Sequence, residues 1–505
     1  MNIRRTKKQI ILYIVIALMV PVAVSSVFLA LYPMGKQSFW SIMPAWNDED
    51  FYYNQVKSIL EYGHPLGYYG YDGSYAKVGN FGAHGWFILV PCILFCFLFG
   101  LHFNSVVIMN HILFSLAILL YGIMFKPKLR DYILWSICIF SPMVLFYSNT
   151  WMMEGCNYSL ALFAALIFAY VSKCEKSSKK ANIMLMLIVI IATLCKITWI
   201  VLVFPAVLLV LEKYEIKMVW RCAISFFVMI FWMIVAWKIY RLFSAPYFVN
   251  SYNIDIYQQL IEKKGLLHGI DEIIMDFVEN VIDTFSTYEF KWIDISKNYI
   301  VFIVITTIVF TIILIKIKRE MYIPLFVLGG FICGTILLYA SEGYAIRTIT
   351  PAALFACAYM VAMLPKGILK YIILIGHIVF LIGTMYVQHS YGFDTRTWYT
   401  AMDEERYEDI EEALKCIVIN ENADTAWENT VMVSLDSYPD RIIELFLPAG
   451  VGINYYMTLP ESNTELKAKY ILMSQDNISR IEMLEDLGYQ IKEEIEGAIV
   501  LERIR

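Results

Sequence analysis

Long apolar runs separated by short polar segments follow one another from about residue 10 to residue 390. Most of the runs approach the roughly 20 residues that an α-helix needs to cross the hydrocarbon core of a bilayer. The pattern predicts a polytopic α-helical membrane protein with about eleven crossings. The predicted crossings are Ile10–Tyr32, Ser105–Phe125, Asp131–Tyr147, Cys156–Ser172, two short segments within Ala181–Leu211, Met218–Tyr240, Tyr299–Ile315, Tyr322–Ala340, Thr348–Leu364 and Tyr371–His389.

Two apolar segments do not fit a simple crossing. Trp86–Gly100 is short and contains a proline, and counting it as a crossing would place the basic clusters Lys126–Arg130 and Lys173–Lys180 outside the cell. Because basic loops stay in the cytoplasm, we predict that this segment is re-entrant or lies on the membrane surface. The run Ala181–Leu211 is too long for one span, and we predict that it breaks at Lys196.

Lysine and arginine residues between the runs predict the orientation. The basic segment Arg4–Lys8 places the N-terminus in the cytoplasm, and we expect the first run to remain as an anchor. Residues 33–85 then form the first outer loop, and residues 243–297 form another with an amphipathic stretch at Ile270–Phe285. Within the first loop, Asp48–Gly63 has the apolar spacing of a short amphipathic helix.

The long apolar runs end at about residue 390, which divides the chain into a transmembrane domain, 1–390, and a tail, 391–505. Short apolar runs alternate with helical patterns in the tail, so we predict a small α/β domain. Counting the crossings places this domain outside the cell. Its predicted strands are Thr430–Leu435, Ile453–Thr458, Tyr470–Ser474, Tyr489–Glu494 and Ala498–Glu502, and its predicted helices are Glu404–Ala413, Arg441–Leu447 and Ile478–Leu487.

Composition agrees with this class of protein. Hydrophobic residues make up 59% of the 505 positions and charged residues only 17%, which excludes an ordinary soluble protein. Aromatic residues reach 16%, which suits membrane interfaces and loops that contact sugars. Cys416 is the one cysteine of the tail, which therefore cannot contain an internal disulfide, and no Cys/His cluster suggests a metal site. No basic patch indicates nucleic acid as a partner.

Three consecutive acids, Asp48, Glu49 and Asp50, are the strongest candidates for chemistry. Asn47 is a suitable N-cap, and acids in a first turn favour the helix dipole, so capping alone explains the trio as well as function does. The setting favours function, because the acids open a loop rich in glycine and tyrosine that could approach a sugar closely. The loop residues expected to contact substrate are Tyr52, Tyr53, Tyr69 and His84.

The layout resembles that of a known family. A first span, an outer loop that opens with Asp48-Glu49, and a Gly85-Trp86 step into an apolar segment ending at Phe99-Gly100 are similar to the GT-C superfamily. The closest resemblance is to the protein O-mannosyltransferase and aminoarabinose-transferase type, over roughly residues 1–390. It implies a membrane glycosyltransferase that moves a sugar from a polyprenyl-phosphate donor to an acceptor on the outer face, with inversion.

The resemblance also implies roles for particular acids. Asp48 would be the general base that deprotonates the acceptor hydroxyl, and Glu49 would bind or orient the acceptor. Glu154 stands in the second outer loop where relatives often have aspartate, although an interfacial glutamate facing water explains it equally well.

Four cations break the rule that basic residues stay inside: Lys196, Lys238, Arg241 and Arg347. A cation at the outer membrane face is a functional hypothesis. Here it would bind the lipid phosphate and stabilise it as a leaving group. The alternative is that long side chains reach out to lipid headgroups, which suits Lys238 and Arg241 best. Relatives often carry Arg-Tyr at the Arg347 position, whereas this chain has Arg347-Thr348.

We expect no cofactor. The second outer loop lacks an Asp-x-Asp, which favours the branch of the family that works without a metal. The partners would be the polyprenyl-phosphate sugar, membrane lipid and a glycan, lipid or protein acceptor, at a bacterial plasma membrane. Two other functions fit the sequence: a transporter or flippase of lipid-linked glycans, and a non-catalytic membrane scaffold in which the acids only start a helix.

Overall fold

The structure is a computed structural model of the chain. It describes residues 7–33, 38–42, 48–63, 68–71, 85–174, 179–212, 214, 216–241, 260–286, 291, 293–315, 319–339, 345–364, 367–392, 404–420, 422–435, 442–455 and 466–504.

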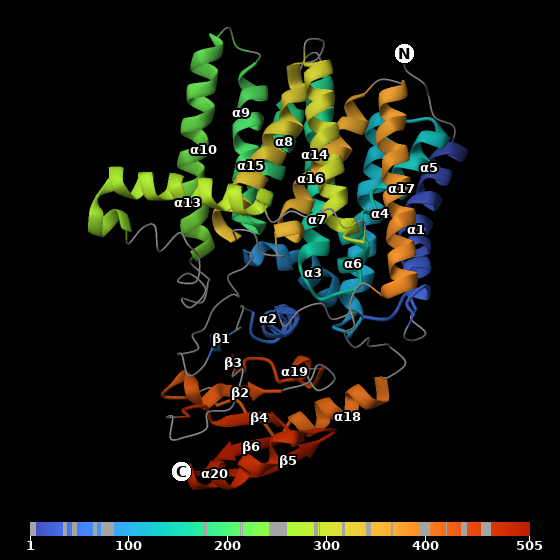
Figure 1. Ribbon diagram of the computed structural model, residues 1–505. Helices are drawn as coiled ribbons and strands as arrows, with labels where there is room; N and C mark the ends of the chain where they lie inside the picture. Colours follow the sequence, from blue (N-terminus) through green and yellow to red (C-terminus); the bar gives the residue numbers. More distant parts are fainter. Residues whose placement is uncertain are drawn as a thin grey trace.

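Most of the helices form a bundle (Figure 1), and each of the eleven predicted crossings coincides with one helix or a broken pair. These elements are α1 (Lys7–Ala30), α4 (Ser105–Phe125), α5 (Leu129–Cys138) with α6 (Pro142–Ser148), α7 (Glu154–Lys173), α8 (Lys179–Cys195), η2 (Ile197–Leu202) with α9 (Val203–Leu211), α10 (Met218–Arg241), α14 (Ile295–Leu314), α15 (Tyr322–Tyr339), α16 (Ala345–Met363) and α17 (Ile368–Tyr391). The short η3 (Arg319–Met321) precedes α15.

Seven of the described helices are long and apolar enough to cross a membrane, or eight if the bent α5–α6 pair is one span. This confirms a multi-pass helical membrane protein. The number of eleven crossings stays a prediction, because α9 and α15 belong to shorter apolar segments.

The run Ala181–Leu211 breaks at Lys196, as predicted, and the short segment Trp86–Phe99 is also divided into two elements. Lys196 has an extended backbone, with φ −151° and ψ 124°, between α8 and η2. Trp86–Phe99 forms η1 (Trp86–Leu89) and α3 (Val90–Phe99), and is shorter than the other apolar helices that could span a bilayer. The side chains of Phe97 and Leu98 on α3 are more than two-thirds exposed. An exposed apolar side on so short a helix agrees with a segment that meets lipid without crossing it.

The helices α7 and α16 form the centre of the bundle. In each of them, 83% of the spanning window is buried, against 11% for α10 and 22% for α1. Small residues permit this close packing: a Cβ on Gly155 of α7 would lie 2.5 Å from the Asn110 side chain of α4. Because α7 starts at Glu154 and Arg347 lies in the first turn of α16, the core of the bundle fixes both residues.

Two amphipathic helices lie outside the bundle (Figure 1). The predicted loop helix is α2 (Asp48–Tyr62), which lies between the bundle and the C-terminal domain. The predicted amphipathic stretch of the later loop is α13 (Leu266–Ser286), which runs across the direction of the bundle helices. The apolar side chains of α13, among them Leu267 and Ile274, are mostly exposed.

The C-terminal domain is built on a six-stranded sheet in the order β1-β3-β2-β4-β6-β5. The pairs β1–β3, β3–β2 and β2–β4 are parallel, and the pairs β4–β6 and β6–β5 are antiparallel. The tail supplies α18 (Glu404–Leu414), η5 (Ala426–Asn429), β2 (Thr430–Ser434), α19 (Ile442–Leu445), β3 (Gly452–Tyr455), β4 (Tyr470–Ser474), η7 (Gln475–Arg480), α20 (Ile481–Asp486), β5 (Tyr489–Ile495) and β6 (Ala498–Arg503), close to the predicted elements.

One strand of this sheet comes from the transmembrane part of the chain. Strand β1 (Tyr68–Tyr71) belongs to the first outer loop and pairs with β3 in parallel register, Tyr69 opposite Ile453. No pattern in the sequence indicated this pairing, because β1 is only four residues long. The first loop and the tail therefore share one sheet, which connects α2 to the C-terminal domain.

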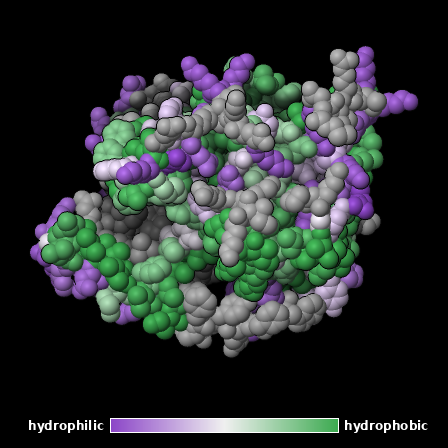
Figure 2. Space-filling model, turned by 90° about the horizontal axis from the view of Figure 1, so that it is seen from above, coloured by the Kyte–Doolittle hydropathy of each residue, from purple (hydrophilic) through white to green (hydrophobic). Residues whose placement is uncertain are grey.

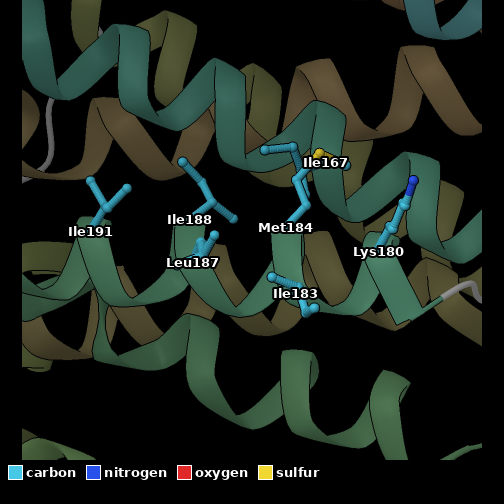
Figure 3. Close-up of a pocket in the computed structure, with 7 residues that line it drawn as sticks. All are labelled: Ile167, Lys180, Ile183, Met184, Leu187, Ile188 and Ile191. Carbon is cyan, nitrogen blue, oxygen red and sulfur yellow. The ribbon is translucent and has the colours of Figure 1, made fainter.

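The far end of the bundle, where the N-terminus lies in Figure 1, is opposite the C-terminal domain. Figure 2 looks down on this end and shows hydrophilic side chains across it and hydrophobic ones along part of its rim. A groove of about 360 Å³ runs along α8, with Lys180 at one end and apolar side chains along the rest (Figure 3). All the residues that line the groove belong to α7 and α8. The groove is therefore separate from the acids of α2.

Candidate functional site

The N-terminal turn of α2 brings Asp48 to the first turn of α16. Arg347 Nη2 lies 3.8 Å from Asp48 Oδ2, and the two side chains are only 17% and 18% exposed. The two residues are about 300 positions apart in the chain, yet they form an ion pair that solvent screens weakly. The predicted capping residue Asn47 lies outside the described residues.

The surroundings of Asp48 keep it ready to accept a proton near neutral pH. Burial raises the pKa of Asp48 from 3.8 to about 6. The positive charge of Arg347 lowers this pKa, and the negative charges of Glu154 and Asp50 raise it. A carboxylate with a pKa of about 6 is a stronger base than an ordinary aspartate and is still ionised at pH 7.

Glu49 faces a different partner. Its Oε2 accepts a hydrogen bond of 2.7 Å from the backbone N–H of Trp151, and the residue is almost fully buried. Tyr53, one turn further along α2, packs edge-on against the Trp151 ring at 4.6 Å. Glu49 therefore joins the start of α2 to the segment that precedes α7, and this contact holds the start of α2 in place.

Glu154 and Lys196 complete the charged cluster. Glu154 is the buried first residue of α7, and Lys196 is buried at the break after α8. Lys196 interacts electrostatically with both Glu154 and Arg347. The close approach of Gly85 secures this break: its N–H donates to Cys195 O at 2.9 Å, and a Cβ there would lie 1.9 Å from a backbone oxygen.

Aromatic and amide side chains that the sequence reading missed surround these charges. Tyr158 of α7 is buried and interacts electrostatically with Glu154 and Arg347, and the buried Tyr240 of α10 interacts with Tyr52. Asn157 accepts a hydrogen bond of 2.7 Å from Trp199 Nε1. One signal could have found two of them, because Asn157 and Tyr158 stand three and four residues after Glu154 and share its helix face.

Tyr52 was expected to contact substrate, and it faces the charged cluster. Burial raises the pKa of its hydroxyl well above the usual value, and the charges of Asp48 and Glu154 raise it further. The hydroxyl therefore stays protonated and can donate a hydrogen bond in the site.

Several predicted site residues do not join the cluster in the part of the chain that the structure describes. The side chain of Lys238 is exposed, which favours its alternative role at lipid headgroups. His84 and the side chains of Tyr69 and Arg241 lie outside the described residues, and their roles stay predictions. Among the described residues, no group of three or more His, Cys, Asp or Glu side chains could hold a metal ion.

The arrangement combines one proton acceptor with two cations. Asp48 supplies a buried carboxylate, and Arg347 and Lys196 supply hydrogen-bond donors with positive charge. Such cations suit a phosphate group, and the carboxylate beside them suits the removal of a proton from a neighbouring hydroxyl.

No family model matches the sequence, and no curated protein matches it significantly. Two similar solved structures stand out. The crystal structure of ArnT from Cupriavidus metallidurans bound to undecaprenyl phosphate has a TM-score of 0.50 at 11% identity and covers 99% of each chain. The archaeal oligosaccharyltransferase AglB from Archaeoglobus fulgidus, in complex with an inhibitory peptide and a dolichol-phosphate, has a TM-score of 0.44 at 13% identity over 92% of this chain and 70% of that chain.

The likeness to ArnT extends over the transmembrane bundle and the C-terminal domain together. The chain therefore shares the overall fold of this ArnT structure.

Proposed function

We propose that this protein is an integral membrane glycosyltransferase that uses a polyprenyl-phosphate-linked sugar as donor. The observation that carries the proposal is the contact of Asp48 with Arg347, at a site that also holds the buried Lys196 and Glu154. ArnT, which shares the fold, was crystallised with undecaprenyl phosphate, and this supports a lipid phosphate as the ligand of the two cations.

The reaction would be a single displacement. Asp48 accepts the proton of the acceptor hydroxyl while the hydroxyl oxygen attacks the anomeric carbon of the donor. The bond between that carbon and the phosphate oxygen breaks, and the polyprenyl phosphate leaves with the electron pair. Arg347 and Lys196 stabilise the negative charge that develops on the phosphate. One displacement at the anomeric carbon inverts its configuration.

The ion pair between Asp48 and Arg347 suggests how donor binding prepares the base. Arg347 lowers the pKa of Asp48 in the free protein. A phosphate that draws the guanidinium away would weaken this effect and would add a further negative charge nearby. Both changes raise the proton affinity of Asp48 when the donor is in place. We therefore expect kcat/KM to fall about tenfold per pH unit below a pH of about 6, the pKa of Asp48 in the free protein, and kcat to begin falling at a higher pH.

The test is a transfer assay on the purified protein with a series of polyprenyl-phosphate sugars and membrane extracts as acceptors. We expect the wild-type protein to release polyprenyl phosphate and Asp48→Asn to release it about 10²–10⁴-fold more slowly. Asp409→Asn is the matched control, since Asp409 is an exposed acid of α18. Wild-type rates in Asp48→Asn would refute this residue as the base.

A transporter of lipid-linked glycans is the second candidate, because it would also need buried cations at the membrane surface. Reconstituted vesicles separate the two functions. Movement of an intact lipid-linked sugar between leaflets, without release of polyprenyl phosphate, would overturn the glycosyltransferase proposal.

A further inference from the structure

We infer that the C-terminal domain sets the position of α2, and that Lys57 is the positioning residue through which it acts. The inference rests on the proposed function in one respect: the group being positioned is the base Asp48. It assigns to the domain a task at the reaction centre, in addition to covering the membrane domain.

Lys57 joins α2 directly to the C-terminal domain. Its Nζ donates hydrogen bonds to the carbonyl oxygens of Leu445, at 2.8 Å, and Leu447, at 2.5 Å. Leu445 is the last residue of α19, and carbonyls at a helix C-terminus have no partner within the helix. The amino group supplies that partner and lies 4.9 Å from the centre of the Tyr53 ring.

The electrostatic surroundings of Lys57 suit this contact. Burial lowers the pKa of Lys57 to about 7, while the charges of Glu411 on α18 and of Glu61 and Asp50 on α2 oppose the shift. An ammonium has three hydrogens and a neutral amine has two, so either form can donate to both carbonyls.

Two further contacts fix the same helix to the domain. Gly450 N–H donates to Ser58 Oγ at 3.1 Å, and the backbone at Gly450 has φ +84°. A Cβ at Gly450 would lie 3.2 Å from the Tyr62 ring, so a glycine lets this turn approach α2 closely. Beyond α2, strand β1 continues into the sheet of the domain through its pairing with β3. The segment from Lys57 to Tyr71 is thus held by the domain at several points.

The helix transmits this attachment to the site. Asp48 and Lys57 lie about 14 Å apart along the axis of α2, at 1.5 Å per residue. Asp48 meets Arg347 of the bundle, whereas Lys57 meets the domain. A helix is stiff over this length, so a shift or tilt at Lys57 displaces Asp48 relative to the cations, which belong to the bundle.

A second set of contacts reaches the start of α2 by another route. Tyr407 and Phe446 of the domain pack against the Phe103 ring, at 4.8 Å and 5.9 Å. The carbonyl of Phe103 accepts a 2.9 Å hydrogen bond from Trp151 Nε1, and the Trp151 backbone holds Glu49. The domain therefore supports both ends of the helix that carries the proposed base.

Lys57→Met tests the inference, with Ser58→Ala as an independent variant. We expect kcat to fall about 10–100-fold, since a displacement near 1 Å at a reacting group costs about 10². The KM for the lipid donor stays within about twofold, because Arg347 and Lys196 are untouched. Lys57→Arg keeps a cationic donor and recovers most of the rate. Lys492→Met is the control, because Lys492 pairs with Glu502 inside the sheet, away from α2.

Amide hydrogen exchange of residues 48–62 gives a readout that does not depend on activity. We expect faster exchange in Lys57→Met and Ser58→Ala but not in Lys492→Met. If exchange rises while even the wild-type protein transfers no sugar, the proposed function fails and the attachment stands. Unchanged exchange in Lys57→Met, or faster exchange with wild-type kcat, overturns the positioning role.

Discussion

Replacing Asp48 by asparagine should stabilise the protein at neutral pH while it slows transfer about 10²–10⁴-fold. Burial raises the pKa of Asp48 from 3.8 to about 6, so the folded chain favours the protonated carboxyl more than the unfolded chain does. Between these two values the folded state binds more protons, and its stability falls as the pH rises. Above a pH of about 6 the full cost of a charged Asp48 is present.

The size of this cost follows from the shift. A difference of about two pKa units corresponds to about 3 kcal/mol, which is an upper value because the side chain is 18% exposed. The attraction of Arg347 is already included, since the shift compares a charged with a neutral carboxyl in the same place. Asparagine resembles the neutral carboxyl in shape and cannot ionise. Asp48→Asn should therefore gain up to about 3 kcal/mol above pH 6 and nothing below pH 4.

The assay is thermal unfolding in detergent at pH 7.5 and pH 4, with Asp409→Asn as the matched control. We expect the unfolding midpoint of Asp48→Asn to exceed that of the wild type at pH 7.5 and to equal it at pH 4. A variant that is less stable than the wild type at pH 7.5 would refute the reasoning. It would mean that the ion pair with Arg347 outweighs the loss of hydration, so Asp48 would be a structural anchor.

Two further substitutions test the surroundings of the site, and a third tests an ion pair elsewhere in the bundle. Glu154→Gln removes a charge that raises the pKa of Asp48, so the acid limb of the pH–rate profile should move to lower pH; an unmoved limb contradicts this coupling. Arg347→Met should raise the donor KM at least about tenfold, measured by titrating the lipid donor, whereas an unchanged KM would exclude a phosphate contact. Asp131→Asn removes the carboxylate that lies 3.9 Å from the ammonium of the buried Lys370. The free energy of unfolding should therefore fall by about 3–5 kcal/mol, with the donor KM unchanged. An unfolding midpoint equal to that of the wild type would contradict this.

Much of the architecture could be predicted from the sequence. The apolar runs gave the bundle helices within a few residues, and the alternating patterns of the tail gave β2 to β6. The break at Lys196 followed from one charge inside a long apolar run. These features depend on local composition, because a bilayer or a sheet core selects residue types position by position along the chain.

The site itself needed the tertiary structure. The sequence singled out Asp48, Glu154, Lys196 and Arg347 separately, but only the tertiary packing that sets the start of α2 beside Arg347 and near Glu154 brings their charges together. The same packing turns Glu49 away to the Trp151 backbone, although Glu49 adjoins Asp48 in the chain. Neighbours on a helix point about 100° apart, so adjacent acids reach different partners.

The link between α2 and the C-terminal domain is the clearest case of information that the local sequence lacks. Lys57 reads as an ordinary surface lysine of an amphipathic helix, and β1 is too short to show a strand pattern. Their partners, Leu445 and Ile453, lie almost 400 residues further along the chain. By itself the sequence determined which segments form helices and strands and which side chains can do chemistry. The tertiary structure decided which of them meet, because contacts between distant segments depend on packing and geometry that no local pattern records.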